Sequence, residues 1–209
     1  MTDAGQGYIA NPVQACADIP AAPPAGEGPS KAAPAESGAE RAARVRASKP
    51  ARGTRTGFST GACSATAARA CAIGLVTGQV PDTVESLLAN GRRYTFSIHD
   101  GRVEGEGLNR TAHGYVQKFA GDDPDCTDGA HLTVDLRILP GQAGEVRYRA
   151  GPGVGTVTLP GLGLEVGGPA INPVPRRNIA ENLHEVAGSL LAEHGLEVTI
   201  IVPDGEVMA

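Results

Sequence analysis

The sequence predicts an α+β fold, a two-layer sandwich in which helices pack on one face of a mixed sheet, preceded by a disordered tail. Three observations predict it. Short β-prone segments after residue 86 are separated by Gly, Asp and Pro turns, helical segments flank them, and the first 52 residues are rich in Ala, Pro and Gly. We therefore expect an extension over residues 1–52 and one α+β domain over residues 53–209.

The extension has too few large apolar side chains to offset the entropy lost on ordering, as its segment 20–29 illustrates. Helix-forming residues over 39–47 allow one short helix there. Nothing in this stretch resembles a chemical motif, so we expect it to be a disordered tail.

The elements of the domain follow from local signals. A helix is predicted over 62–73, because Ser59 and Thr60 are favourable N-cap residues and glycines 74 and 78 mark its end. A second helix is predicted over 175–194, where a proline suits the first helical position and apolar residues recur at helical spacing. Strands are predicted at residues 86–88, 94–98, 113–119, 131–136, 146–149 and 197–202.

Composition excludes several classes of protein. With 209 residues and 41% hydrophobic content, the chain can form a real core, yet no apolar run approaches the ~18 residues of a membrane-spanning helix. The first thirty residues lack a secretory signal, so we expect a cytoplasmic protein with reduced cysteines that contacts no membrane. A net charge of −5 and an aromatic content of 3% argue against nucleic acid as a partner.

An acidic loop is the first candidate site. The string Lys118-Phe-Ala-Gly-Asp-Asp-Pro-Asp125 holds three aspartates beside the only lysine that follows residue 52. Like charges this close require a cation, a proton or a ligand, unless the loop is simply a solvated turn capped by aspartates. The following residues lack the glycine and closing glutamate of a calcium loop, and we predict no metal held by the protein.

Two glycine motifs each allow more than one interpretation. The string Gly57-Phe-Ser-Thr-Gly61 fits the nucleophile elbow of serine hydrolases, but the predicted tail and not a strand precedes it, which favours an ordinary helix cap or an anion site at a helix start. The string Gly151-Pro-Gly-Val-Gly155 lacks the following helix of a dinucleotide fingerprint. It indicates either backbone brought close to a flat ligand or ordinary turns.

Two arginines occupy the start of the second predicted helix, where the helix dipole is positive. Arg177 is spaced to pair with Glu181 one turn on. Arg176 has no such partner, so its planar guanidinium is predicted to recognise a carboxylate.

In chain order, the strings 55–68, 118–129, 151–161 and 168–176 together resemble the CbiD family, whose members are cobalt-precorrin-5B C1-methyltransferases. The resemblance covers residues 53–209 and implies transfer of a methyl group from S-adenosylmethionine to C1 of cobalt-precorrin-5B, giving cobalt-precorrin-6A in cobalamin biosynthesis. Cobalt would enter only within the substrate. The family's second half is absent from this sequence, which leaves open a homo-oligomer or pairing with the missing half.

The resemblance also implies site residues. The catalytic candidates are Asp122, Asp123, Asp125 and Lys118, and the substrate-binding candidates are Ser59, Thr60, Thr127, Gly153, Gly155, Asn172 and Arg176. Two alternatives remain at this point: a non-catalytic fragment that binds a corrinoid or joins another subunit, and a serine hydrolase that uses Ser59.

Overall fold

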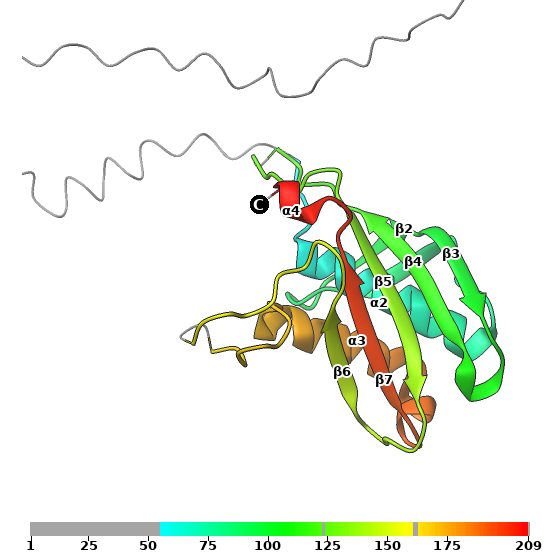
Figure 1. Cartoon of the computed structure of the whole chain (residues 1–209). Coiled ribbons are helices and arrows are strands. Elements are labelled where there is room, and N and C mark those ends of the chain that lie inside the picture. The colour runs from blue at the N-terminus through cyan, green and yellow to red at the C-terminus, as the bar shows by residue number, and fades with distance from the viewer. Residues whose placement is uncertain (1–54, 123, 161–162, 209) are drawn as a thin grey trace, which may run out of the picture. The chain divides into compact units, whose positions relative to one another are not determined.

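The computed structural model describes residues 55–122, 124–160 and 163–208, and the fold belongs to the unit formed by residues 50–209. The predicted extension over residues 1–52 lies outside the described residues. A five-stranded sheet forms one layer of this unit (Figure 1). In spatial order its strands are β3 (His99–Glu104), β4 (Thr111–Gln117), β5 (His131–Leu139), β7 (Gly195–Ile201) and β6 (Val146–Ala150).

The sheet is mixed. Strands β3, β4, β5 and β7 pair antiparallel, whereas β6 pairs parallel with β7. A parallel pair needs a crossover connection, and the helix α3 (Pro173–Leu191) provides it between β6 and β7. The predicted mixed sheet is thereby confirmed.

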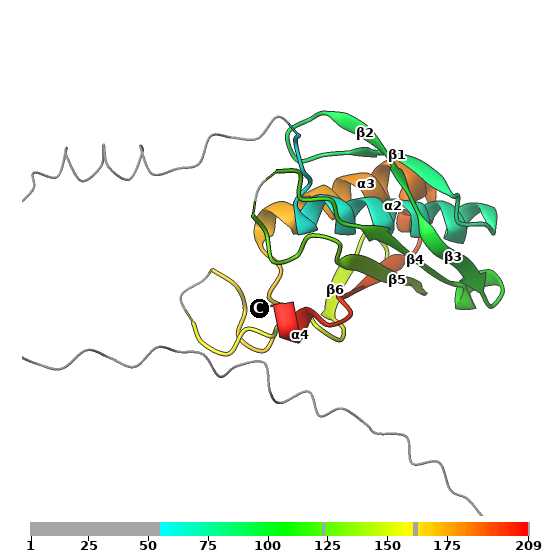
Figure 2. The same cartoon turned by 90° about the horizontal axis from the view of Figure 1, so that it is seen from above.

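Both long helices, α2 (Thr60–Thr77) and α3, lie against the same face of this sheet, as the views in Figures 1 and 2 agree. Leu132, Val134 and Leu136 of β5 point to that face, because alternate residues of a strand share a side, and all three are buried. The predicted α+β class, with helices on one face, is confirmed.

Helix α2 is buried on most of its circumference, which its small side chains permit. On the side away from the large sheet, the antiparallel hairpin of β1 (Thr83–Leu87) and β2 (Arg93–Ser97) covers the helices (Figure 2). This hairpin forms a sheet of its own. The strands predicted at residues 86–88 and 94–98 therefore belong to a second sheet, which adds a layer on the far side of the helices.

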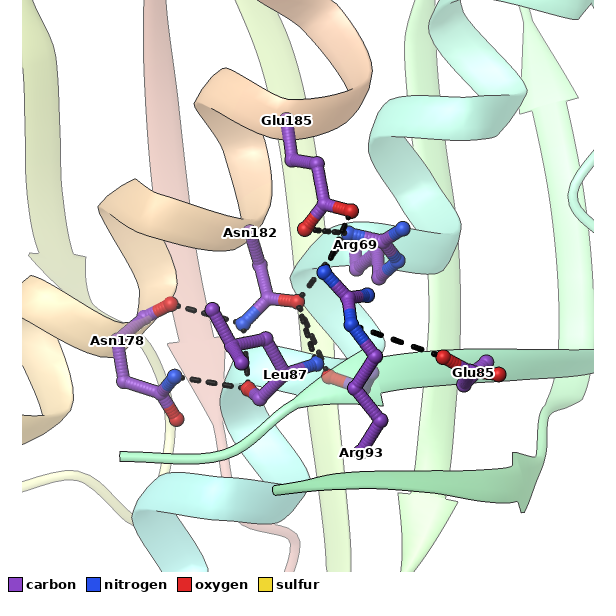
Figure 3. A network of polar contacts seen from close by, with 8 residues as sticks. Arg69, Glu85, Leu87, Arg93, Asn178, Asn182 and Glu185 are labelled. Atoms are coloured by element: carbon purple, nitrogen blue, oxygen red, sulfur yellow. Dashed lines mark hydrogen bonds and ion pairs between the residues drawn. The ribbon is translucent and has the colours of Figure 1, made fainter. Parts of the chain in front are cut away.

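A polar network fastens the hairpin to the helices (Figure 3). Asn182 of α3, fully buried, donates to the carbonyl oxygen of Leu87 at 2.8 Å and accepts from the Leu87 N–H at 3.2 Å. Glu185, one turn on, bridges Arg69 of α2 at 3.1 Å and Arg93 of β2 at 2.7 Å. The hairpin is therefore held by specific hydrogen bonds as well as by apolar packing.

Some boundaries differ from the expectation. Helix α3 starts at Pro173, with Asn172 as its N-cap, two residues before the predicted start, and ends at Leu191 rather than 194. Strand β3 was not predicted, because it is an edge strand with mostly exposed residues and no clear alternation. Two short helices complete the described fold, η1 (Gly107–Asn109) and α4 (Gly205–Met208). Within the described residues, no helix combines the length and apolarity needed to cross a membrane.

Candidate functional site

A cavity of about 400 Å³ lies where the N-termini of α2 and α3 converge. Its wall takes residues from every motif that the sequence singled out. Of the predicted substrate-binding residues, the following line it: Thr60, Thr127, Gly153, Gly155 and Asn172. The structure thus brings together residues that lie more than a hundred positions apart in the sequence.

The two helix ends can approach because Gly61 has no side chain. A Cβ at that position would lie 2.8 Å from Cγ of Pro175 in the first turn of α3. Ser59 caps α2 by accepting a hydrogen bond from the Ala62 N–H at 3.2 Å. Asn172 has the extended backbone of an N-cap, yet its exposed side chain makes no capping bond, which leaves its amide available at the cavity wall.

The glycine loop after β6 serves the fold at one position and the cavity at another. Gly153 has φ +72°, and a Cβ there would lie 1.8 Å from the carbonyl oxygen of Val202, so this glycine permits close approach to the turn that follows β7. Gly155 is different, since its nearest neighbour would be the Ala170 Cβ at 3.7 Å. Of the two, only Gly155 has room beside it for a ligand.

The acidic loop receives its cations from the chain itself. Lys118, whose side chain is 1% exposed, donates to Oδ2 of Asp125 at 2.7 Å, and Thr127 donates to Oδ1 through its backbone N–H at 2.8 Å and its hydroxyl at 2.6 Å. The bonds from Lys118 and Thr127 hold the pKa of Asp125 well below its usual range. The expected need for a cation is met by Lys118.

A second cation holds the other end of this loop. Arg55 donates to Asp122 through Nε at 2.8 Å and through its backbone N–H at 2.9 Å. A bridge between Thr56 and Gly121 and a bond from the Phe58 N–H to the carbonyl oxygen of residue 119, at 2.8 Å, continue the pairing. The segment before α2 is therefore paired with the acidic loop. Asp123 lies outside the described residues.

The described residues among the predicted catalytic set thus chiefly hold the acidic loop in place. Neither Asp122, Asp125 nor Lys118 lines the cavity, which the loop reaches through Cys126 and Thr127. Lys118 also lies close to the buried Cys63; burial raises the pKa of that thiol to about 11, and the ammonium opposes the rise. The contacts favour a positioning role for Lys118 and Asp125, while their catalytic assignment stays a prediction.

Arg176 is engaged within the protein. Its guanidinium donates to the carbonyl oxygens of Ile171 at 2.9 Å and Pro169 at 3.0 Å, and it lies 5.4 Å from the ring centroid of Tyr148. The Tyr148 hydroxyl donates to the Arg176 carbonyl oxygen at 2.7 Å, and burial raises the pKa of this tyrosine to about 12. Neutral carbonyl oxygens occupy two of the Arg176 donors, and its recognition of a substrate carboxylate stays a prediction.

The neighbouring Arg177 shows the opposite behaviour. It is exposed, and the pairing with Glu181 that its spacing allows is not made. Arg177 forms no ion pair or side-chain hydrogen bond with any residue that the structure describes. Within residues 55–122, 124–160 and 163–208, Arg177 is thus a cation at the start of α3 without a side-chain partner.

Ser59 lines a second cavity, of about 290 Å³, which shares Gly61 and Pro175 with the first. No histidine lines this cavity among the described residues, and the segment before Ser59 makes a single bridge rather than a strand. A nucleophile elbow needs both a base and a strand. The interpretation as a helix cap therefore accounts for the Gly57-to-Gly61 motif.

Several residues that line the cavity were not predicted from the sequence. The apolar part of the wall comes from Leu132, Val154, Ile171, Ile200, Val202 and Met208, and Ser64 lines the cavity from α2. Ser64 follows Thr60 by four residues, the spacing that places two side chains on one helix face, and this was the one available signal. No charged side chain lines the cavity within the described parts of the chain. Residues 55–122, 124–160 and 163–208 hold no group of three His, Cys, Asp or Glu side chains placed to bind a metal ion.

Comparison with known proteins identifies relatives. A protein from Polaromonas sp. (strain JS666) is 65% identical over 161 residues, which cover 75% of this chain and 43% of the relative. One from Dechloromonas aromatica (strain RCB) is 60% identical over 159 residues, covering 76% and 40% respectively. Both carry the name cobalt-precorrin-5B C(1)-methyltransferase. The chain spans about two fifths of the length of these relatives.

Among solved structures, the cobalamin biosynthesis protein (cbiD) from Archaeoglobus fulgidus matches with a TM-score of 0.48 and 24% identity, over 74% of this chain and 45% of that one. The family model described as CbiD matches residues 47–209, a range that includes every described element and the whole cavity wall. The chain belongs to the CbiD family.

Proposed function

We propose that this chain takes part in the S-adenosylmethionine-dependent C1-methylation of cobalt-precorrin-5B. The observation that carries the proposal is the convergence of the family's four motifs on one cavity at the start of α2 and α3. The names of the relatives support the reaction, and their identity of 60–65% over this region supports its extension to this chain.

The donor supplies an electrophilic methyl carbon: the bond from sulfur breaks, the bond to C1 forms, the sulfonium becomes a thioether, and a proton leaves the macrocycle. Positioning of donor and acceptor governs the rate of such a displacement. The residues around the cavity suit this task. Its wall is anchored by the ion pairs of Lys118 with Asp125 and of Arg55 with Asp122, so Thr127 is held in a defined place.

The corrinoid carries several acetate and propionate arms, which require cations or backbone N–H groups. Arg177 is suited to bind one arm, because it is exposed and unpaired among the described residues. Arg176 retains donors on Nη1, yet its bonds to residues 169 and 171 fix it mainly as a clamp on the segment before α3. We therefore assign carboxylate recognition to Arg177 first and to Arg176 second.

The test mixes the purified chain with S-adenosylmethionine labelled in its methyl group and with cobalt-precorrin-5B. Incorporation of label into the corrinoid is expected, with an Arg177→Ala variant requiring more corrinoid for half-maximal rate. Glu181→Ala, an exposed change one turn along the same helix, is the matched control.

The same experiment tests the non-catalytic alternative that the sequence left open. On this alternative the chain binds a corrinoid or completes another polypeptide but transfers no methyl group alone. A shift in corrinoid absorbance without incorporation of label would select it. Absence of both would reject the proposal in either form.

A further inference from the structure

Ser64 lies at the cavity wall, and its hydroxyl has no hydrogen-bond partner among the described residues. Other hydroxyls of α2 donate to the carbonyl oxygen four residues earlier, Thr66 at 2.9 Å and Thr77 at 2.8 Å. Ser64 is only 4% exposed, lines the cavity, and makes no side-chain hydrogen bond with any residue that the structure describes. Because the residue is almost fully covered elsewhere, its hydroxyl is reached from the cavity, and a ligand there can form a hydrogen bond with it.

The residues that line the cavity also indicate the charge of the ligand. The polar groups are neutral, chiefly Thr60, Thr127 and Asn172, and the remainder of the wall is largely apolar. No described residue places a charged side chain there. A corrinoid with many carboxylates, or a nucleotide with a polyphosphate, would lack the cations that such groups require. The chemistry fits an uncharged heterocycle with a compact polar tail.

The volume of the cavity also favours a ligand smaller than the corrinoid. About 400 Å³ is near the lower end of the ~300–1,000 Å³ that small-molecule sites occupy. A nucleoside bearing an amino-acid tail is of this size, whereas a tetrapyrrole-derived macrocycle is several times larger. The macrocycle is thus left outside the cavity.

We propose that this cavity is the site of the methyl donor, with Ser64 as a donor-contacting residue and the corrinoid bound outside the cavity. The inference rests on the proposed function and divides its two ligands between separate places. The apolar wall receives the adenine ring, and Ser64 supplies a hydrogen bond within it. The carboxylate of the amino-acid tail is suited to the partial positive charge where α2 and α3 begin.

Calorimetric titration of the full chain with S-adenosylhomocysteine tests this without catalysis. One equivalent is expected to bind. Ser64→Ala should weaken binding ~5- to 10-fold, the loss of one hydrogen bond. Gly155→Leu should weaken it at least ~50-fold, because Gly155 has no positive φ and its new side chain would extend into the open space near Ala170. ATP should not bind.

Ala89→Leu is the matched control, since Ala89 is exposed and lines only the second cavity. Its affinity for S-adenosylhomocysteine should equal that of the unaltered chain. Circular dichroism and melting temperature show that each variant is folded. Ser64→Ala, which removes a single unpaired hydroxyl, keeps the test decisive should the leucine variant unfold.

A second readout uses Cys126, an exposed free thiol on the cavity wall. In a Cys16→Ser background, S-adenosylhomocysteine should slow alkylation of Cys126 by iodoacetamide at least ~5-fold at saturation. The proposal is overturned by no binding to the unaltered chain, by undiminished binding to Ser64→Ala or to a folded Gly155→Leu, or by loss confined to Ala89→Leu. None of these results alters the corrinoid absorbance test, so failure here is distinguishable from failure of the proposed function.

Discussion

Asn182 offers the sharpest test of how the fold is held. Its side chain is fully buried, and it joins α3 to the hairpin strand β1 through both its oxygen and its nitrogen (Figure 3). The oxygen also accepts from the hydroxyl of the buried Ser86 at 3.2 Å. Replacement by leucine keeps a similar size and removes every one of these bonds.

The magnitude follows from the groups left behind. In Asn182→Leu the Leu87 N–H and the Ser86 hydroxyl lose their acceptor, whereas the Leu87 carbonyl oxygen keeps a bond from Asn178 at 2.8 Å. Each unsatisfied buried group costs ~1–3 kcal/mol, two cost roughly 2–6 kcal/mol, and the added apolar contact returns about 1 kcal/mol. We expect the free energy of unfolding to fall by about 3 kcal/mol. With a urea dependence of ~2 kcal/mol per M, the midpoint should fall by ~1.5 M.

Urea unfolding followed by circular dichroism measures this change, and Glu181→Ala, one position earlier and exposed, is the control. Hydrogen exchange supplies the location: amides over residues 83–97 should exchange faster than those of β5. A loss below ~1 kcal/mol, or equal protection of hairpin and sheet, would refute the reasoning.

Three further outcomes are expected. Gly57→Ala should lower the free energy of unfolding by ~2 kcal/mol or more, because the new Cβ would lie 2.0 Å from the Ala120 carbonyl oxygen. Thermal unfolding measures this, and a melting temperature within ~1 °C of the unaltered chain, equivalent to about a quarter kcal/mol, would contradict it. Because the pKa of Asp125 is lowered in the folded chain, its ionised carboxylate stabilises the fold above pH ~4, and this stabilisation is lost as the pH falls. Between pH 7 and pH 3 the melting temperature of Asp125→Asn should therefore drop less than that of the unaltered chain. Equal drops would count against the ion pair of Asp125 with Lys118. Arg176→Ala should lower the melting temperature, because its guanidinium holds the segment before α3. Arg177→Ala should weaken corrinoid binding at an unchanged melting temperature. The reverse pattern would favour carboxylate recognition by Arg176.

Local signals were sufficient for the helices. Ser59 lies at the N-cap of α2 as its side chain and position indicate, and the spacing of apolar residues located α3 within a few residues. Strand β3 had no such signal, since its exposed edge position imposes no alternation of polar and apolar residues. The separate sheet of the hairpin also lay beyond the sequence, because it depends on side-chain bonds between residues about ninety positions apart.

For the site, motif strings identified which segments meet but not what each side chain does. Gly153 was expected to approach a ligand, and it approaches the backbone of Val202. Arg176 was expected to meet an anion, and its guanidinium donates to carbonyl oxygens five and seven residues earlier. These internal contacts could not be predicted, because a glycine or an arginine has the same local sequence whether its partner is a ligand or another part of the chain, and the binding roles of both residues stay predictions.

The acidic loop illustrates a division between charge and binding. Repulsion among its aspartates is relieved by Lys118 and Arg55, so the charges join segments rather than face the cavity. Both oxygens of Asp125 are bonded and its pKa is lowered, so this carboxylate is a poor proton acceptor, and we do not expect it to act as the base of the proposed reaction. The polar groups at the cavity are hydroxyls, an amide and helix N-termini, and on our proposal these would bind the methyl donor without neutralising its sulfonium. If the proposed reaction holds, such a site would orient the methyl group, and the acceptor of the proton would lie outside the cavity wall.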